Sequence, residues 1–141
     1  KLPTVRTKSK HNPKKPLFKA IGKAALAKMG TFQPRELSNL GLAFWRTGLV
    51  SPRLLEAICT SSRSKFNDDF ESVNFATVCW AMANSAFRAP NFFEAAVQHA
   101  KPENLGPELL PMLALAVCYA SALSDVGLKA TPIAAWFEDV A

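Results

Sequence analysis

The stretch Phe32–Phe44 (FQPRELSNLGLAF) recurs along the chain. A shift of 38 positions places it on Phe70–Met82, and a further shift of 39 places Val78–Ala83 on Val117–Ala122. A period between about 20 and 50 residues is the sequence signature of a repeat architecture. The stretch therefore marks the first of about three repeated units.

Each unit predicts two helices. In the first helix, apolar residues such as Leu37, Leu40 and Phe44 recur at helical spacing. The second helix begins at a proline, which is tolerated at the first helical position because its missing N–H would have no partner there. The expected helices span residues 16–29, 34–47, 52–62, 70–85, 90–100, 109–124 and 132–139.

We expect an all-α fold, an α-solenoid of about three helical hairpins in a right-handed stack, each burying its apolar face against the next. The expected organisation is a basic extended arm followed by one helical-repeat domain. Their ranges are 1–15 for the arm and 16–141 for the domain, with a partial unit at 16–30 and repeats at about 32–65, 70–104 and 109–141.

Small residues align between the units. The aligned Ala43, Ala81 and Ala120 predict positions where two helices cross closely. Cys79 and Cys118 occupy equivalent positions and are interpreted as small buried hydrophobic residues.

The charge of the chain is unevenly distributed. The 141 residues carry a formal net charge of +6, but Lys1 to Arg35 contain ten basic residues and no acidic one. From Glu36 onward there are seven basic and eleven acidic residues. This asymmetry predicts a polyanionic partner, RNA or DNA first and an anionic membrane second. A solubilising tail or the remnant of an organelle-targeting sequence is the alternative.

The sequence lacks the residue patterns that are typical of catalytic and metal sites. Three cysteines cannot all pair and lack zinc-site spacing, and His11 and His99 are far apart. Catalytic triads, HExxH motifs and Gly-rich phosphate loops are absent from the sequence. We therefore expect no enzyme activity, no catalytic residue, no metal and no cofactor. The longest apolar stretch, Leu109–Leu123, is shorter than the roughly 20 residues that cross a bilayer and predicts a buried helix, not a transmembrane segment.

The unit beginning at Phe32–Phe44, followed by a proline and by Leu54-Leu55-Glu56-Ala57, resembles the octotricopeptide and related heptatricopeptide repeats. The likeness covers Phe32 to roughly Phe137. It implies an α-solenoid of mitochondria or chloroplasts that binds RNA through polar side chains of its first helices. Members act in transcript maturation, translation or organellar ribosome assembly, and some are permanent parts of mitochondrial ribosomes in protists. HEAT-like repeats, which mostly bind proteins, are the alternative.

The candidate RNA-binding residues lie in the N-terminal part of the chain. Lys15, Lys19 and Lys23 recur at every fourth residue and predict one basic stripe on a helix, while Phe18 and Ile21 of that helix, together with Leu26, are expected to pack inward. The full set is Arg6, Lys8, Lys10, Lys14, Lys15, Lys19, Lys23, Arg35, Asn39 and Arg46.

The candidate protein interface lies in the third unit. At the positions aligned with the polar ones of the first unit, the third unit carries the apolar residues Met112, Leu115 and Leu123. Polarity therefore fades along the repeats, which favours RNA at the N-terminal end and a neighbouring protein at the C-terminal end.

The sequence favours a non-enzymatic RNA-binding helical-repeat protein, a structural component of a mitochondrial ribosome that contacts rRNA through its basic arm and first hairpins. A chloroplast is the alternative location. The alternative function is an accessory subunit that scaffolds proteins in a large organellar complex without RNA, its basic arm meeting an acidic protein surface or anionic lipid.

Overall fold

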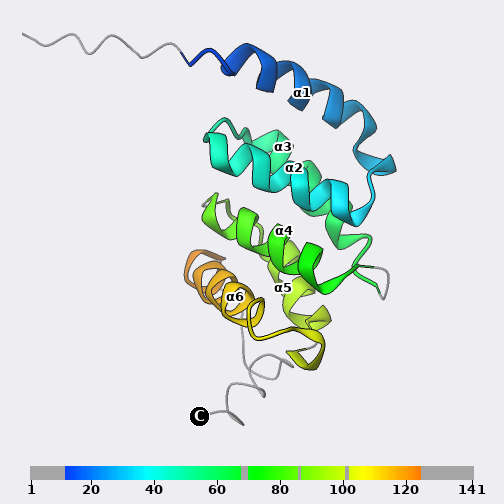
Figure 1. Cartoon of the computed structure of the whole chain (residues 1–141), viewed down its shortest axis with the longest axis vertical. Coiled ribbons are helices and arrows are strands. Elements are labelled where there is room, and N and C mark those ends of the chain that lie inside the picture. Colours follow the sequence, from blue (N-terminus) through cyan, green and yellow to red (C-terminus); the bar gives the residue numbers. More distant parts are fainter. Residues whose placement is uncertain (1–11, 68–69, 86, 101, 125–141) are drawn as a thin grey trace, which may run out of the picture.

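The computed structural model describes residues 12–67, 70–85, 87–100 and 102–124, and every regular element in these ranges is a helix (Figure 1). The helices are α1 (Lys15–Lys28), α2 (Pro34–Thr47), α3 (Pro52–Arg63), α4 (Ser72–Asn84), α5 (Pro90–His99) and α6 (Leu110–Ser124), with single 3₁₀ turns at Met29–Thr31 and Pro102–Asn104. The expected all-α class and these six helices are confirmed. Residues 1–11 of the expected arm and the expected helix at 132–139 lie outside the described residues.

Local sequence explains where the helices begin and end. Proline occupies the first turn of α1, α2, α3 and α5. At the start of α2 the Gln33 N–H donates to Glu36 Oε2 at 2.8 Å, and at the start of α3 the Leu54 N–H donates to Ser51 Oγ at 3.3 Å. Helix α2 ends at Gly48, whose φ of 66° is a left-handed conformation that glycine adopts without strain.

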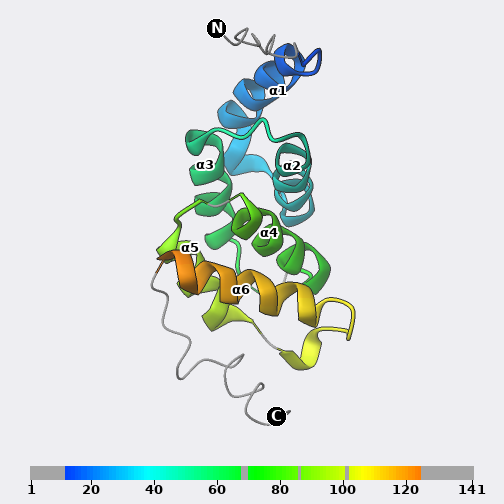
Figure 2. The same ribbon diagram turned by 90° about the vertical axis from the view of Figure 1, so that its left-hand side faces the viewer.

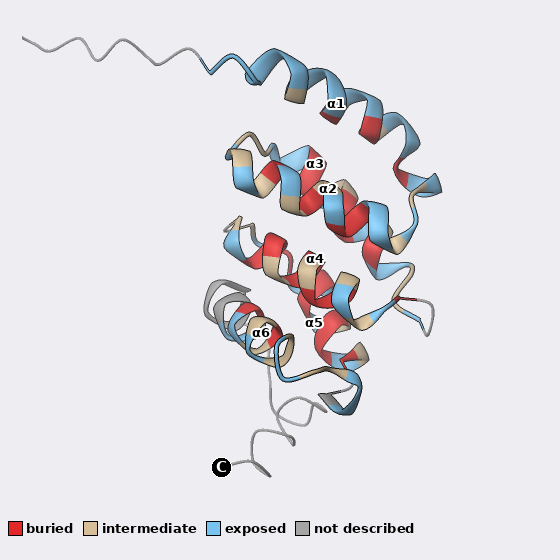
Figure 3. Ribbon diagram, in the orientation of Figure 1, coloured by how far each residue is buried: buried red, intermediate tan, exposed pale blue. Residues whose placement is uncertain are grey.

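The helices pack in two columns. Helix α2 lies along α4, and α4 lies along α6; α3 and α5 form the second column behind them (Figures 1 and 2). Helix α1 lies across the top of this arrangement and contacts α3. The residues buried on these helices (Figure 3) therefore lie mainly where α2 packs on α4 and α4 packs on α6.

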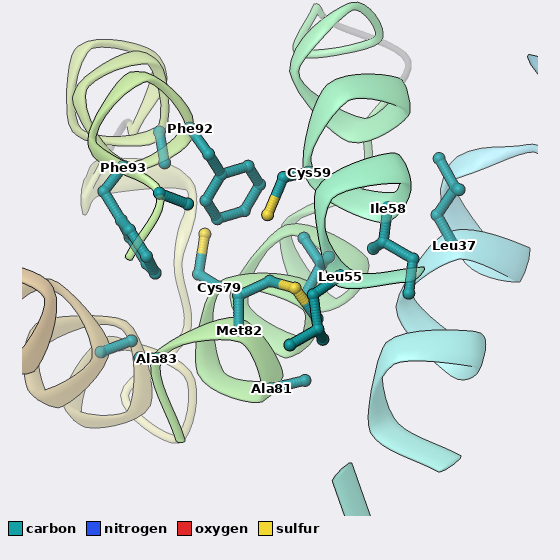
Figure 4. Close-up of a cluster of buried hydrophobic side chains, with 14 of the residues drawn as sticks. Leu37, Leu55, Ile58, Cys59, Cys79, Ala81, Met82, Ala83, Phe92 and Phe93 are labelled. Atoms are coloured by element: carbon teal, nitrogen blue, oxygen red, sulfur yellow. The ribbon is translucent and has the colours of Figure 1, made fainter. Parts of the chain in front are cut away.

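Helix α4 provides the centre of the core. Its buried residues face α2, α3 and α6, and they include Val78, Cys79 and Met82, each fully buried (Figure 4). A Cβ atom added to Gly41 of α2 would lie 3.1 Å from Met82 Cε and 3.6 Å from Ala81 Cβ. The missing side chain at Gly41 therefore permits the close crossing of α2 and α4.

The predicted position at a helix crossing is wrong for one of the aligned alanines. Ala81 is fully buried at the α2–α4 crossing, as expected, but Ala43 is exposed. Gly41, two residues earlier, lies at the crossing instead, where a Cβ atom would lie 3.1 Å from the end of the Met82 side chain. The Ala120 side chain lies outside the described residues.

The burial pattern corrects the alignment of α6. Leu113 and Ala116 are buried, and a shift of 38 from α4 places them on the buried Phe75 and Val78. The 39-residue shift was therefore wrong by one position for this helix. One position corresponds to a rotation of about 100° about the helix axis, so the face predicted for each residue of α6 changes by that angle. The expectation that Cys118 is buried is likewise wrong, since it is exposed and no described element covers that side of α6.

A cluster of rings joins the hairpins. The Phe66 ring, in the segment between α3 and α4, lies with centroids 5.2 Å from Phe70 and Phe75 and 5.5 Å from Phe92. It stacks on His99 of α5 at 5.6 Å. These contacts fix α4 and α5 against the end of α3.

The crossing of α2 and α4 can be tested by filling the space at Gly41. We expect Gly41→Val to lower the free energy of unfolding by about 1–3 kcal/mol, because the added methyl groups must displace Met82 and Ala81. The measurement is urea denaturation followed by circular dichroism. Gly30→Val is the control, since nothing lies within 4 Å of a Cβ there, and it is expected to change stability by no more than about 0.5 kcal/mol. Equal stability of the two variants would contradict the assignment.

Candidate nucleic-acid interface

Helix α1 carries the basic stripe. Lys15, Lys19 and Lys23 are all exposed and lie on one face of α1, with a rise of about 6 Å between neighbours. The expected stripe is therefore present. No acidic residue occurs in the first turn of α1. Three like charges at this spacing repel one another and favour an anionic partner.

The inward face of α1 differs in part from the expected one. The Phe18 ring packs edge-on against Phe44, with centroids 5.1 Å apart, and Leu26 is half-buried, both as expected. Ile21, however, is 40% exposed, so its expected inward position is wrong. The buried positions are Gly22 and Ala25, because glycine lets α1 approach the Phe44 ring to within van der Waals contact.

A groove runs between α1 and the loop that joins α2 to α3. Its volume is about 710 Å³, and its apolar lining includes Phe18, Phe44 and Val50. The cations that line it are Lys15, Lys19, Lys23 and Arg53. None of the residues that line this groove carries a carboxylate. The groove is therefore apolar in its floor and positively charged at its rim, and we call it the first groove.

Arg53 was not predicted from the sequence. It is exposed in the first turn of α3, where it resembles any solvated surface arginine. Only the packing of α3 against α1 brings it to the same groove as the three lysines. The pattern of neighbouring residues carried no signal for this proximity.

The predicted residues of α2 form a separate row. Arg35, Asn39 and Arg46 are all exposed, and their spacing of four and seven residues places them on one face of α2. None of the three lines the first groove. The structure thus divides the predicted RNA-binding residues between α1 and a second face on α2.

The outward row of α2 continues onto α4 and α6 with decreasing polarity. At the corrected spacing of 38, Asn39 corresponds to Thr77 and then to Leu115. The Thr77 hydroxyl donates to the Val73 carbonyl at 2.7 Å, while Val73 and Leu115 are 49% and 61% exposed. The third unit therefore presents apolar surface where the first presents polar side chains.

The remaining predicted residues have mixed outcomes. Lys14 is exposed just before α1, and its N–H donates to Asn12 Oδ1 at 3.0 Å. Met112 is half-buried. Arg6, Lys8 and Lys10 lie outside the described residues, as does the side chain of Leu123.

Two of the cysteines have buried thiols of low reactivity. Cys59 of α3 and Cys79 of α4 are buried and point toward one another beside Phe92 (Figure 4). Burial raises the pKa of the Cys59 thiol to about 12 and raises the pKa of Cys79 as well. Among the described residues no group of three or more His, Cys, Asp or Glu side chains is placed to hold a metal ion.

The difference between the cysteines predicts a labelling pattern. At pH 8 we expect iodoacetamide to modify the exposed Cys118 rapidly in the native protein and to leave Cys59 and Cys79 unmodified. The physical reason is that a raised pKa reduces the fraction of reactive thiolate, and burial blocks access. Mass spectrometry should find one adduct in the native protein and three in urea. Rapid native modification of Cys79 would contradict the described core.

No protein family, curated protein or solved structure matches this chain. Within the described ranges, none of the helices combines the length and the apolar character needed to cross a lipid bilayer.

Proposed function

We propose that this protein is a non-enzymatic RNA-binding helical-repeat protein. In this proposal its two columns of helices are hairpin repeats of an α-solenoid similar to the octotricopeptide type. The observation that carries the proposal is the first groove, where three lysines and Arg53 surround an apolar floor and no lining residue is acidic. Phosphates are held by such cations without regard to base sequence.

The proposed assembly is an organellar ribosome, most concretely a mitochondrial one, in which the protein is a structural component bound to rRNA. Support comes from the uneven charge of the chain, with ten basic and no acidic residues up to Arg35. The exposed row of Arg35, Asn39 and Arg46 adds groups that contact phosphates and base edges.

The proposal predicts salt-dependent RNA binding. We expect Lys19→Gln/Lys23→Gln to weaken binding of a short fluorescein-labelled RNA roughly 10- to 30-fold at 0.1 M salt, measured by fluorescence anisotropy. The slope of log K against log salt should become shallower by about 1.4, because two phosphate contacts are lost.

The matched control removes two cations outside the first groove. Lys28→Gln/Lys65→Gln changes the net charge equally, and neither residue lines the groove. Its RNA binding is expected to stay within about twofold of the wild type. Salt-independent binding by the wild-type protein, or equal losses in both variants, would overturn the proposed role of the groove.

A second candidate function is the scaffolding of proteins in a large organellar complex. The exposed apolar side chains Val73 and Leu115 on neighbouring helices favour it. Apolar side chains gathered on one face are typical of protein contacts. In a ribonucleoprotein the two functions are compatible, with RNA at α1 and α2 and a protein neighbour at α6.

The apolar face of α6 predicts a partner contact. We expect Leu115→Glu to remain folded, with a melting temperature within a few degrees of the wild type, since Leu115 is 61% exposed. The same variant should be reduced at least tenfold in the native assembly, measured by affinity purification and quantitative mass spectrometry. Gln98→Glu adds one negative charge at an exposed position of α5 and serves as the control. Normal incorporation of Leu115→Glu would exclude this interface.

A further inference from the structure

The first groove has a counterpart one hairpin further along. A second groove of about 320 Å³ lies between α3 and the loop that joins α4 to α5. Figure 2 shows the two places: the α2–α3 loop passes beneath α1, and the α4–α5 loop passes beneath α3. On the loop side, Leu49 and Leu54 of the first groove correspond to Phe87 and Phe92 of the second at the 38-residue spacing.

The helix side of the two grooves is equivalent as well. The segment Leu17–Ile21 (LFKAI) is similar to Leu54–Ile58 (LLEAI) at a shift of 37 positions. It places Lys19, Gly22, Lys23 and Leu26 of the first groove on Glu56, Cys59, Thr60 and Arg63 of the second. The two grooves therefore form at equivalent places, each where a described loop passes under the preceding helix.

A shallow depression connects the two grooves. It shares Leu26 and Arg53 with the first groove, and Glu56 and Thr60 with the second. Its other lining residues belong to α3 and to the 3₁₀ turn between α1 and α2. The surface from Lys15 to Arg88 is thus continuous along this edge of the molecule, and we call it the basic edge.

The basic edge carries many more cations than carboxylates. Its six cations, all exposed, are Lys15, Lys19, Lys23, Arg53, Arg63 and Arg88. The one acidic residue among its lining is Glu56. Six of the eleven described Lys and Arg residues, but only one of the six described Glu residues, therefore lie on it.

The chemistry of both grooves fits a nucleic-acid strand better than an isolated anion. Each groove has apolar side chains in its lining, Phe44 and Val50 in the first and Phe87 in the second. Bases and sugars present apolar faces to such side chains, while phosphates need the surrounding cations. The second groove adds Thr60 and Asn91, whose polar groups hydrogen-bond to bases or sugars.

We propose that the bound RNA follows the basic edge, from the α1 lysines through Arg53 to Arg63 and Arg88, and so engages both grooves. This proposal rests on the RNA-binding function proposed above and specifies the path of the strand. It assigns a role to α3 and to the start of α5, which carry none of the predicted RNA-binding residues.

The test compares charge removal at the far end of the basic edge with charge removal elsewhere. We expect Arg63→Gln/Arg88→Gln to weaken binding of the fluorescein-labelled RNA roughly 10- to 30-fold at 0.1 M salt and to make the salt slope shallower by about 1.4. The control Lys28→Gln/Lys65→Gln removes the same charge and should bind within about twofold of the wild type. Circular dichroism establishes that each variant is folded.

A second measurement on the wild-type protein does not depend on variants. Ultraviolet crosslinking to the same RNA, followed by mass spectrometry, should place nucleotide adducts on peptides containing Thr60 and Asn91 as well as on α1. If Arg63→Gln/Arg88→Gln binds like the control while Lys19→Gln/Lys23→Gln is weakened, the basic edge is overturned and RNA binding at α1 stands. If the wild-type protein binds no RNA, both proposals fail. Adducts confined to α1 and α2 would also exclude the path.

Discussion

The close approach of α2 and α4 at Gly41 is the constraint on which the rest of the structure depends. A Cβ atom at this position would lie 3.1 Å from Met82 Cε and 3.6 Å from Ala81 Cβ, so the absence of a side chain permits the close packing of α2 on α4. Helix α4 is then positioned to bury its other faces against α3 and α6. The two columns are completed where α4 packs on α6 and α3 packs on α5.

The same repetition explains why charge gathers at one edge. Apolar positions of each hairpin are used inside the stack, so cations remain only on surfaces that no neighbouring hairpin covers. The two described loops between paired helices, α2–α3 and α4–α5, lie 38 residues apart, and each leaves a groove. Residues far apart in sequence, such as Lys19 and Arg88, are thereby brought onto one continuous surface. On the described part of α6, at the other end of the described helices, the exposed residues include the apolar Leu115.

Helical periodicity was enough to predict the helices, because apolar spacing and first-turn prolines act locally. It did not predict which residues meet. Ile21 matches a helical apolar pattern but is exposed, since Gly22 rather than a larger residue faces Phe44. The 39-residue shift used to align α6 was chosen because the residue types match. The burial pattern instead fits a shift of 38. Arg53 joined the lysines only through packing between α1 and α3, a long-range contact that no local pattern encodes.

The composition of α1 has a consequence for its own stability. Lys15 stands at the helix N-terminus, where the macrodipole disfavours positive charge, and Lys19 and Lys23 repel it and one another. The helix is held mainly by Phe18, Gly22 and Ala25 against the rest of the protein. Neutralising the lysines would remove the repulsion, so an anion bound there also makes α1 more resistant to local opening. The rate of amide hydrogen exchange in α1 therefore reports whether an anion is bound to the α1 lysines, because binding removes the charge repulsion that favours opening of the helix.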